Sequence, residues 1–121
     1  MIKTIGLLAR KPGWTHEQFM THWVETHAPL ARAVPGLRRY VQNHIEGERT
    51  RAYIEGLVLD IDGIAELWFD DRAALETAAR SPEMQALHAD GALFIGRIRS
   101  YIVEEKVVVP VVPTGAERSE A

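Results

Sequence analysis

The sequence predicts an α+β domain in which a four-stranded antiparallel sheet carries helices on one face. Segments with the composition of strands and helices follow in the order strand, helix, strand, strand, helix, strand. The 121 residues suit one domain and are too few for two. There is no cysteine, which excludes disulfide scaffolds, zinc ribbons and thiol nucleophiles, and a domain of this size buries enough surface to fold without a metal.

The first strand and the first helix have clear signals. Residues 3–10 alternate and are rich in aliphatic side chains, and the KPG turn at 11–13 ends them. Thr15, with Gln18 three residues later, forms a capping box that predicts the start of a helix. The apolar stripe of this helix, at four-residue spacing, consists of Phe19, Trp23, His27 and Ala31.

Pro29 falls inside this helical pattern. It has no N–H to donate to the carbonyl of Glu25, and it disfavours a helical conformation at Ala28. We therefore expect the helix to kink or loosen just after His27 and to end at the PG pair, residues 35–36.

The second strand is expected over Leu37–Glu46 and has polar residues in its interior. Side chains of a strand alternate between its two faces. One face therefore carries Leu37, Val41 and Ile45, and the other carries Arg38, Tyr40, Gln42, His44 and Glu46. We call Tyr40, Gln42 and His44 the polar row, because glutamine and histidine are unusual in the middle of a strand.

The second half of the chain is expected to hold a strand, two helical segments and a final strand. Residues 47–61 form a polar connection whose shape the sequence does not predict, and Gly63–Asp70 reads as a third strand. Asp70 or Asp71 is expected to cap a short helix over 72–80. The Ser-Pro pair at 81–82 starts another helical segment, whose buried side is expected to hold Met84, Leu87, Leu93 and Phe94.

The last strand is expected to follow Gly96 and to run over residues 97–109. This closes a domain of residues 1–109. Pro110 and Pro113 stop regular pairing, and residues 110–121 are expected to form an extended, disordered tail.

This order of elements is typical of a ferredoxin-like fold, which places both helices on one face of the sheet. The other face can simply be exposed to water. The apolar run VVVPVV at 107–112 favours instead a partner subunit that covers it. We therefore expect a homodimer through the sheet faces, which would enclose a cavity lined by the polar row.

The charges and termini exclude two classes of partner. Fourteen Lys and Arg stand against seventeen Asp and Glu, a formal net charge of -3, and the two signs are interspersed, which argues against nucleic acid. No basic segment precedes a long apolar run, so we expect no signal peptide, no membrane span and a cytoplasmic location.

The spacing of the histidines argues against a metal site. His22 and His27 are five residues apart, which on an α-helix separates them by about 140° around the axis. Helical metal-binding pairs usually share a face at a spacing of three or four. A metal site would need a ligand that is distant in the sequence, such as His44, to lie beside these histidines in the folded chain. We expect no metal and no cofactor, assign His16 no role, and place His22 at the helix edge and His88 on the exposed side of its helix.

His27 and Tyr40 each have two interpretations. His27 either fills the apolar stripe or lies at a cavity wall as an acid–base group, where the negative end of the helix dipole would raise its pKa. Tyr40 is either a packing residue or a donor to a developing enolate oxygen. Glu66 on the third strand either pairs with Arg38 or Arg99 or lines the cavity.

Four segments carry a resemblance to a known family: KPGWTHEQFMTHWVETHAPLA, PGLRRYVQNH, DGIAELWFDD and ALFIGRIRSYIVEE. From residue 2 to about residue 107 the chain resembles the EthD domain family, which implies a dimeric α/β barrel built from two ferredoxin-like sheets. The resemblance extends to methylmuconolactone methylisomerases, whose catalytic histidine and strand tyrosine are matched by His27 and Tyr40. Their third-strand cysteine is replaced by Leu67, and their loop histidine has no counterpart in ERTRAYIEG.

We therefore expect a cofactor-independent enzyme that acts by proton transfer on a small carbonyl-bearing lactone, aromatic or polyketide-type compound, as an isomerase, cyclase or dehydratase. In this hypothesis His27 is the general base and then the acid, and Tyr40 stabilises the enolate oxygen. Contacts to the substrate are expected from Trp23, Gln42, His44 and Leu67. Two alternatives stay open: a non-catalytic protein that binds a metabolite of a degradation pathway, and a cofactor-free monooxygenase.

Overall fold

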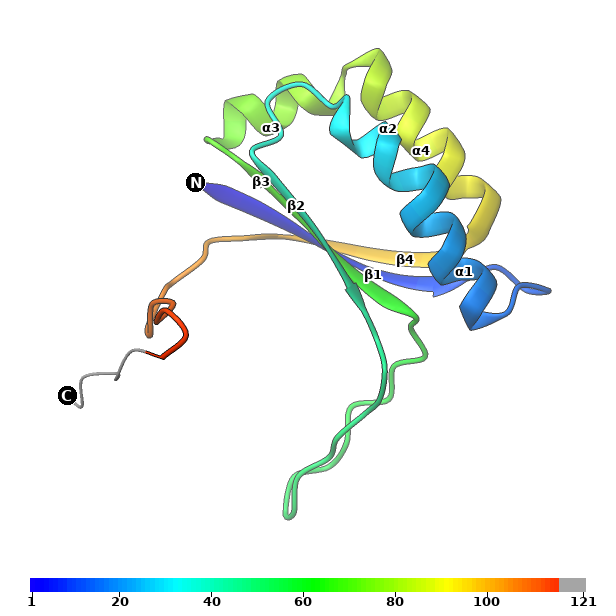
Figure 1. The fold of residues 1–121 in the computed structure, drawn as a ribbon, viewed down its shortest axis with the longest axis vertical. Helices are drawn as coiled ribbons and strands as arrows, with labels where there is room; N and C mark the ends of the chain where they lie inside the picture. The colour runs from blue at the N-terminus through cyan, green and yellow to red at the C-terminus, as the bar shows by residue number, and fades with distance from the viewer. Residues whose placement is uncertain (116–121) are drawn as a thin grey trace.

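The computed structural model describes residues 1–115, in which four strands form one antiparallel sheet. The strands are β1 (Ile2–Arg10), β2 (Arg39–His44), β3 (Gly63–Phe69) and β4 (Ile95–Val103). Their order across the sheet is β2-β3-β1-β4. Helices cover one face of the sheet and leave the other face open (Figure 1).

The helices come from two segments of the chain. The first runs without a break from α1 (His16–His22) through a π-helical turn, η1 (Trp23–His27), to α2 (Ala28–Arg32). The second contains α3 (Arg72–Ala79) and α4 (Pro82–Phe94). With the strands they give the predicted ferredoxin-like arrangement, so the prediction of fold class is confirmed. No helix of the described residues is long and apolar enough to cross a membrane.

Side chains cap the helices where the sequence predicted. Thr15 accepts a hydrogen bond from the N–H of Gln18, and the Gln18 side chain accepts one from the N–H of Thr15, which completes the capping box. Asp71, rather than Asp70, caps α3, and Ser81 caps α4. Each such cap stabilises its helix by about 1 kcal/mol, so the local sequence defines where the helices begin.

The last strand is shorter than predicted. β4 ends at Val103, not at residue 109, because its partner strand β1 begins at Ile2 and offers no backbone to pair with beyond that point. The apolar run follows an irregular path, and its valines are exposed except for the half-buried Val112. Half of the tail that we predicted to be disordered, residues 116–121, lies outside the described residues.

The polar row faces the helices and not the open side of the sheet. In the pairing of β2 with β3, Tyr40, Gln42 and His44 lie opposite Leu67, Ala65 and Gly63. Gln42 is hydrogen-bonded to the backbone of η1, and His44 stacks on a tryptophan of that turn. The prediction that a partner subunit would close a cavity over this row is therefore wrong, because the protomer's own helices already cover it.

The open face of the sheet carries a charged network instead. The carboxylate of Glu66 accepts hydrogen bonds from Lys3 at 3.0 Å and from Asn43 at 3.1 Å. Glu66 thus pairs with neither arginine that we considered: Arg38 pairs with Asp70 at the end of β3. The error arose because cross-strand neighbours, which the sequence does not name, decide the pairing of a strand carboxylate.

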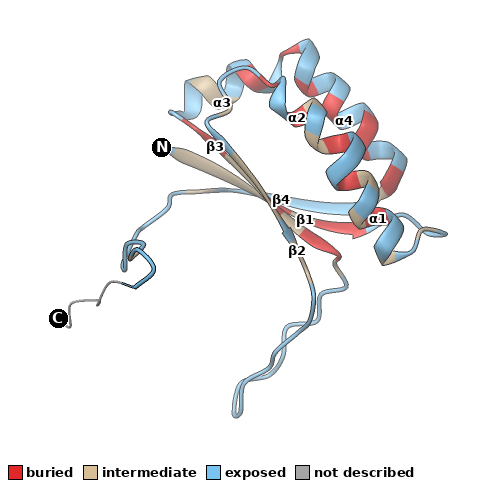
Figure 2. Ribbon diagram, viewed as in Figure 1, coloured by how far each residue is buried: buried red, intermediate tan, exposed pale blue. Residues whose placement is uncertain are grey.

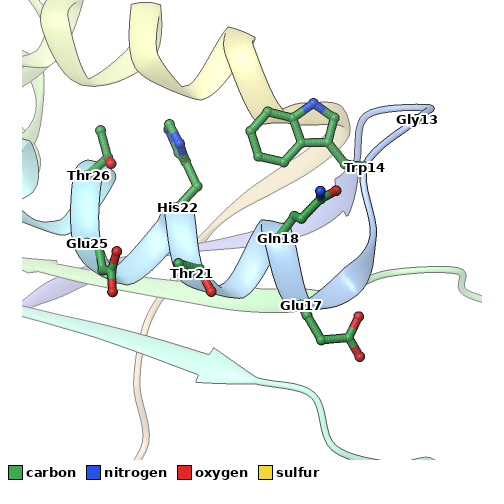
Figure 3. Close-up of a pocket in the computed structure, with 8 residues that line it drawn as sticks. All are labelled: Gly13, Trp14, Glu17, Gln18, Thr21, His22, Glu25 and Thr26. Atoms are coloured by element: carbon green, nitrogen blue, oxygen red, sulfur yellow. The ribbon is translucent and has the colours of Figure 1, made fainter.

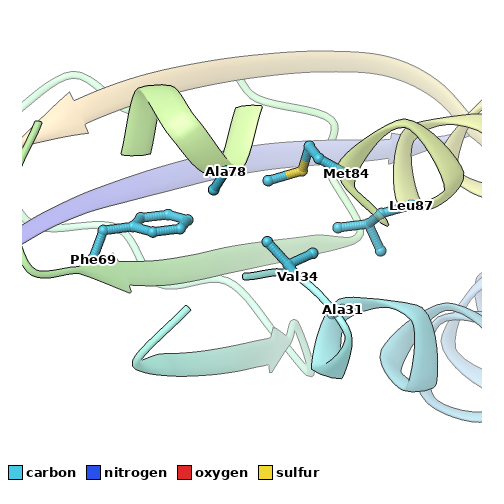
Figure 4. Close-up of a cluster of buried hydrophobic side chains, with 6 residues drawn as sticks. All are labelled: Ala31, Val34, Phe69, Ala78, Met84 and Leu87. Atoms are coloured by element: carbon cyan, nitrogen blue, oxygen red, sulfur yellow. The ribbon is translucent and has the colours of Figure 1, made fainter. Parts of the chain in front are cut away.

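The core lies between the helices and the sheet, where the facing sides of both layers are buried (Figure 2). One cluster of buried side chains packs α2, α3 and α4 onto the end of β3 and contains Ala31, Val34, Phe69, Ala78, Met84 and Leu87 (Figure 4). A second cluster packs α1 and η1 and contains Leu8, Phe19, Trp23, Ala65 and Phe94. Leu93, expected in the core, is 59% exposed, because its neighbour Phe94 takes the inward position.

The connection between β2 and β3 leaves the sheet as a long arm without regular secondary structure (Figure 1). Its end is fixed by Asp62, which is buried. This carboxylate accepts hydrogen bonds of 2.7 Å from the backbone N–H of Arg10, from its guanidinium and from His16 Nδ1. His16, to which we assigned no role, therefore ties the base of the arm to the start of α1.

Gly63 is expected to tolerate no side chain, because a Cβ there would overlap the ring of Trp23. The variant Gly63→Ala should lower the free energy of unfolding by about 1–3 kcal/mol, as overpacking of a core does. Urea denaturation measures this loss. Gly47→Ala is the matched control, because a Cβ at that position meets nothing within 4 Å. Equal stability of the two variants would show that Trp23 is not held against β3.

Candidate active site

The π-helical turn η1 shapes the site. Within it the N–H of Ala28 donates to the carbonyl of Trp23, five residues back. We attribute the wide turn to Pro29, whose ring has no N–H and would collide with the carbonyl of Glu25 in a regular α-helix. The predicted loosening is thus present, but it lies over the turn that ends at His27 rather than after it.

The wide turn brings two imidazoles to one carboxylate. Asp90 on α4 lies 2.7 Å from His27 Nδ1 and 3.0 Å from His22 Nε2. Because the hydrogen bonds of a π-helix span five residues, residues at this spacing lie on one side of it. Our prediction that His22 and His27 face apart, with His22 at the helix edge, assumed an α-helix and is wrong. Within residues 1–115, no three histidine, aspartate or glutamate side chains form a group that could hold a metal ion.

His27 is neutral at pH 7 with one ring nitrogen free. Burial lowers the pKa of His27 below its ordinary value of 6.5, and the hydrogen bond and charge of Asp90 offset only part of this effect. We expected a raised pKa from the helix dipole, but the helical segment continues to Arg32, so His27 is not at its end. Since Asp90 accepts from Nδ1–H, Nε2 carries the lone pair. No group of residues 1–115 is hydrogen-bonded to Nε2.

Tyr40 is held by a chain of hydrogen bonds on β2. The Gln42 Nε2 group donates one hydrogen to the carbonyl of Trp23 and the other to the hydroxyl oxygen of Tyr40, each at 2.9 Å. This orientation leaves Gln42 Oε1 to accept from His44 Nε2 at 3.0 Å, and the His44 ring stacks on Trp23. The Tyr40 hydroxyl is an acceptor in this chain, so its own proton remains available to a ligand.

The phenol of Tyr40 stays protonated at neutral pH. Burial raises the pKa of Tyr40 above 10, and the hydrogen bond from Gln42 counteracts this only in part. The indole N–H of Trp23 also lowers the pKa of Tyr40, as Gln42 does. It does not reach hydrogen-bond geometry with any group of the described residues. A protonated phenol is a hydrogen-bond donor for a carbonyl or enolate oxygen.

His27 and Tyr40 line one cavity of about 580 Å³ between the sheet and the helices. Trp23 and Leu67, both expected to contact a substrate, line it as well. The other walls come from β1, β3, β4, α3 and α4. This volume lies within the usual range for small-molecule sites.

Two predicted site residues lie behind this cavity rather than in its wall. Gln42 and His44 are not among the lining residues, and they hold Tyr40 from the side of η1. His88, predicted on the exposed side of its helix, is exposed but borders the cavity.

Asp90 is the site residue that the sequence analysis missed. It stands on a helix with an apolar inner side and belongs to no spacing motif, and its contact to His27 spans 63 positions in the sequence. The one available signal was its position on α4: Asp90 follows Leu87 at a helical spacing of three, which places a carboxylate on the buried side.

A second hollow of about 600 Å³ runs along the outside of α1 (Figure 3). There His22 projects from α1 toward α4, beside Trp14. Glu17 and Glu25 also line this hollow. It is open to solvent, and neither His27 nor Tyr40 reaches it, so we do not place the chemistry there.

Residues 11–98 match the model of the EthD domain family. The chain is 31% identical over 108 residues to 4-carboxymethyl-4-methylbutenolide mutase of Pseudomonas reinekei, covering 88% of this chain and 100% of that protein. Among solved structures, an EthD family protein from Bacillus halodurans is 32% identical, with a TM-score of 0.70, over 88% of this chain and 99% of that one. A dimeric ferredoxin-like protein from Thermobifida fusca is 19% identical, with a TM-score of 0.59, over 84% and 88% of the two chains, and is similar in fold alone.

The variant Asp90→Asn should lower the pKa of His27 further, because it removes the charge and the hydrogen bond that oppose the effect of burial. An NMR titration of the histidine side chains measures this shift. Gln85→Ala, an exposed position on the same helix, is the control and should leave the titration unchanged. A pKa that stays the same or rises in Asp90→Asn would contradict the pairing of His27 with this carboxylate.

Proposed function

The chain belongs to the EthD domain family, and from this membership and the geometry of the cavity we propose that it is an enzyme that isomerises a small lactone by proton transfer. The observation that carries the proposal is the pair of groups in one cavity: a neutral imidazole with a free nitrogen and a protonated phenol. The name of the Pseudomonas reinekei relative, a butenolide mutase, supports a lactone as substrate.

In the proposed reaction His27 Nε2 takes a proton from a carbon made acidic by the lactone carbonyl. The electron pair of that C–H bond moves into the carbonyl, and the Tyr40 hydroxyl donates a hydrogen bond to the enolate oxygen that forms. The imidazolium then returns the proton to another carbon of the conjugated system, which yields the isomer. The step moves only protons and electron pairs and consumes no redox partner.

Asp90 acts in this scheme as a positioning residue. It fixes His27 in the tautomer with the proton on Nδ1, and its negative charge stabilises the imidazolium that exists between the two proton transfers. His22, which contacts the other carboxylate oxygen, holds Asp90 in place. Gln42 and His44 have the equivalent role for Tyr40, and Trp23 and Leu67 supply apolar walls.

The proposed association is a homodimer through the open faces of the sheets. The dimeric protein from Thermobifida fusca supports it. So do half-buried apolar side chains on that face, which are Ile5, Leu7, Val41 and Ile64. A partner on this face would not reach the cavity, which lies on the opposite face of the sheet. Association would therefore stabilise the sheet without completing the site.

His27→Gln should abolish proton exchange from a bound lactone. In deuterium oxide, the protein is expected to replace acidic C–H hydrogens of unsaturated five-membered lactones, and proton NMR follows the loss of signal. Removal of the general base should slow this exchange by about 10²- to 10⁴-fold. Tyr40→Phe should slow it by about 10²-fold, the usual effect of losing one oxyanion donor.

Gln85→Ala serves as the control for this experiment, and circular dichroism checks that each variant is folded. Exchange at an undiminished rate in folded His27→Gln would refute the role of His27. A lactone that the native protein binds but never exchanges would support the metabolite-binding alternative instead.

Val41→Glu should shift the protein from dimer to monomer, because it places a charge on the half-buried open face. Sedimentation velocity reports the change in mass. Leu93→Glu, at an exposed position on α4, is the control and should leave the mass unchanged. A native protein that sediments as a monomer at all concentrations would rule out the dimer.

A further inference from the structure

Among the 19 residues of the described part of the chain that line the cavity, there is no lysine, arginine, aspartate or glutamate. Most of the wall is aliphatic or aromatic. Polar side-chain atoms come from Thr4, Trp23, His27, Tyr40, His88 and Ser100. A ligand inside can therefore form hydrogen bonds, but no permanently charged side chain of residues 1–115 lines its site.

As far as the described residues form it, the mouth of the cavity also has no lysine, arginine, aspartate or glutamate. Its exposed lining residues are Ala79, His88, Ala92, Ile98 and Ser100, from α3, α4 and β4. β4 also carries Arg97 and Arg99, but these alternate with Ile98, which lies opposite Leu8 of the cavity wall. Both arginines therefore project to the other face of the sheet, where they cannot meet a ligand that enters.

A negatively charged side chain lies behind one wall of the cavity. Asp90 lies directly behind His27, 2.7 Å from its Nδ1. A ligand carboxylate that entered would lose its hydration, find no cation and lie close to a second carboxylate. A neutral carbonyl has none of these costs, because the Tyr40 hydroxyl offers it a hydrogen bond.

We infer that the cavity accepts an uncharged lactone or ester and excludes compounds that carry a free carboxylate. This inference rests on the proposed function and narrows its substrate class. The inferred ligand differs in charge from the compound in the relative's name, since a carboxymethyl butenolide carries an ionised carboxylate at neutral pH.

The test compares three ligands with one butenolide ring: a free carboxymethyl side chain, its primary amide and its methyl ester. The amide matches the carboxylate in size. Isothermal titration at about pH 8, where an ordinary histidine is neutral, gives the dissociation constants. The amide and the ester are expected to bind at least about 10-fold more tightly than the carboxylate, because an unpaired buried charge is costly.

A designed cation should reverse this preference. Ser100→Lys places an ammonium group at the mouth, and the position is exposed, so the fold should tolerate it. This variant is expected to bind the carboxylate at least about 10-fold more tightly than the native protein does, by pairing of the two charges. Ser100→Gln is the control of similar length without charge. His88→Gln removes the one imidazole at the mouth and should leave the order of the three ligands unchanged.

The possible results separate the two proposals. Carboxylate binding by the native protein that equals or exceeds amide binding would overturn the inference, and so would failure of all three ligands to bind. Tight binding of the amide and ester without any deuterium exchange would uphold the inference about ligand charge and refute the proposed catalysis.

Discussion

The wide helical turn between Trp23 and His27 is the constraint on which the rest of the site depends. Its carbonyl at Trp23 receives both the N–H of Ala28 and the side-chain amide of Gln42. The first bond changes the phase of the helix, so that His22 and His27 meet the same carboxylate. The second fixes the amide that holds Tyr40. One backbone irregularity thus positions the imidazole on the helix and the phenol on the strand, and the proline that follows keeps the turn from relaxing into a regular helix.

This arrangement places polar groups where a domain of this size would gain stability from apolar ones. His27 and Asp90 are each 8% exposed, and the ring of His27 lies edge-on to the ring of Phe94. Their mutual hydrogen bond satisfies them, but an apolar pair of similar shape would need no such compensation. Buried polar groups at places where packing favours apolar ones are typical of functional sites. The buried pair of His27 and Asp90 therefore indicates a functional site more strongly than the size of the cavity does.

Much of the fold could be predicted from the sequence, and the site only in part. Alternation located the strands, and Thr15, Asp71 and Ser81 located the helix starts, because these signals act over a few residues. Alternation also separated the polar row from the apolar face of β2, but it does not tell which face the helices cover, and we chose the wrong one. Asp90 was missed because its partner is distant in sequence. The downward shift of the His27 pKa was missed because burial, which outweighs the other effects, depends on how the chain packs.

The sheet separates two surfaces by the thickness of a single backbone. In β3, Ala65 and Leu67 shape the chamber, whereas Glu66 and Trp68 belong to the outside. Successive side chains of this strand therefore meet unrelated surroundings, the cavity on one face and the open side of the sheet on the other. Substitutions at every second residue can change the face that lines the cavity and leave the side chains of the open face as they are. The two faces of this small sheet can thus vary independently of each other.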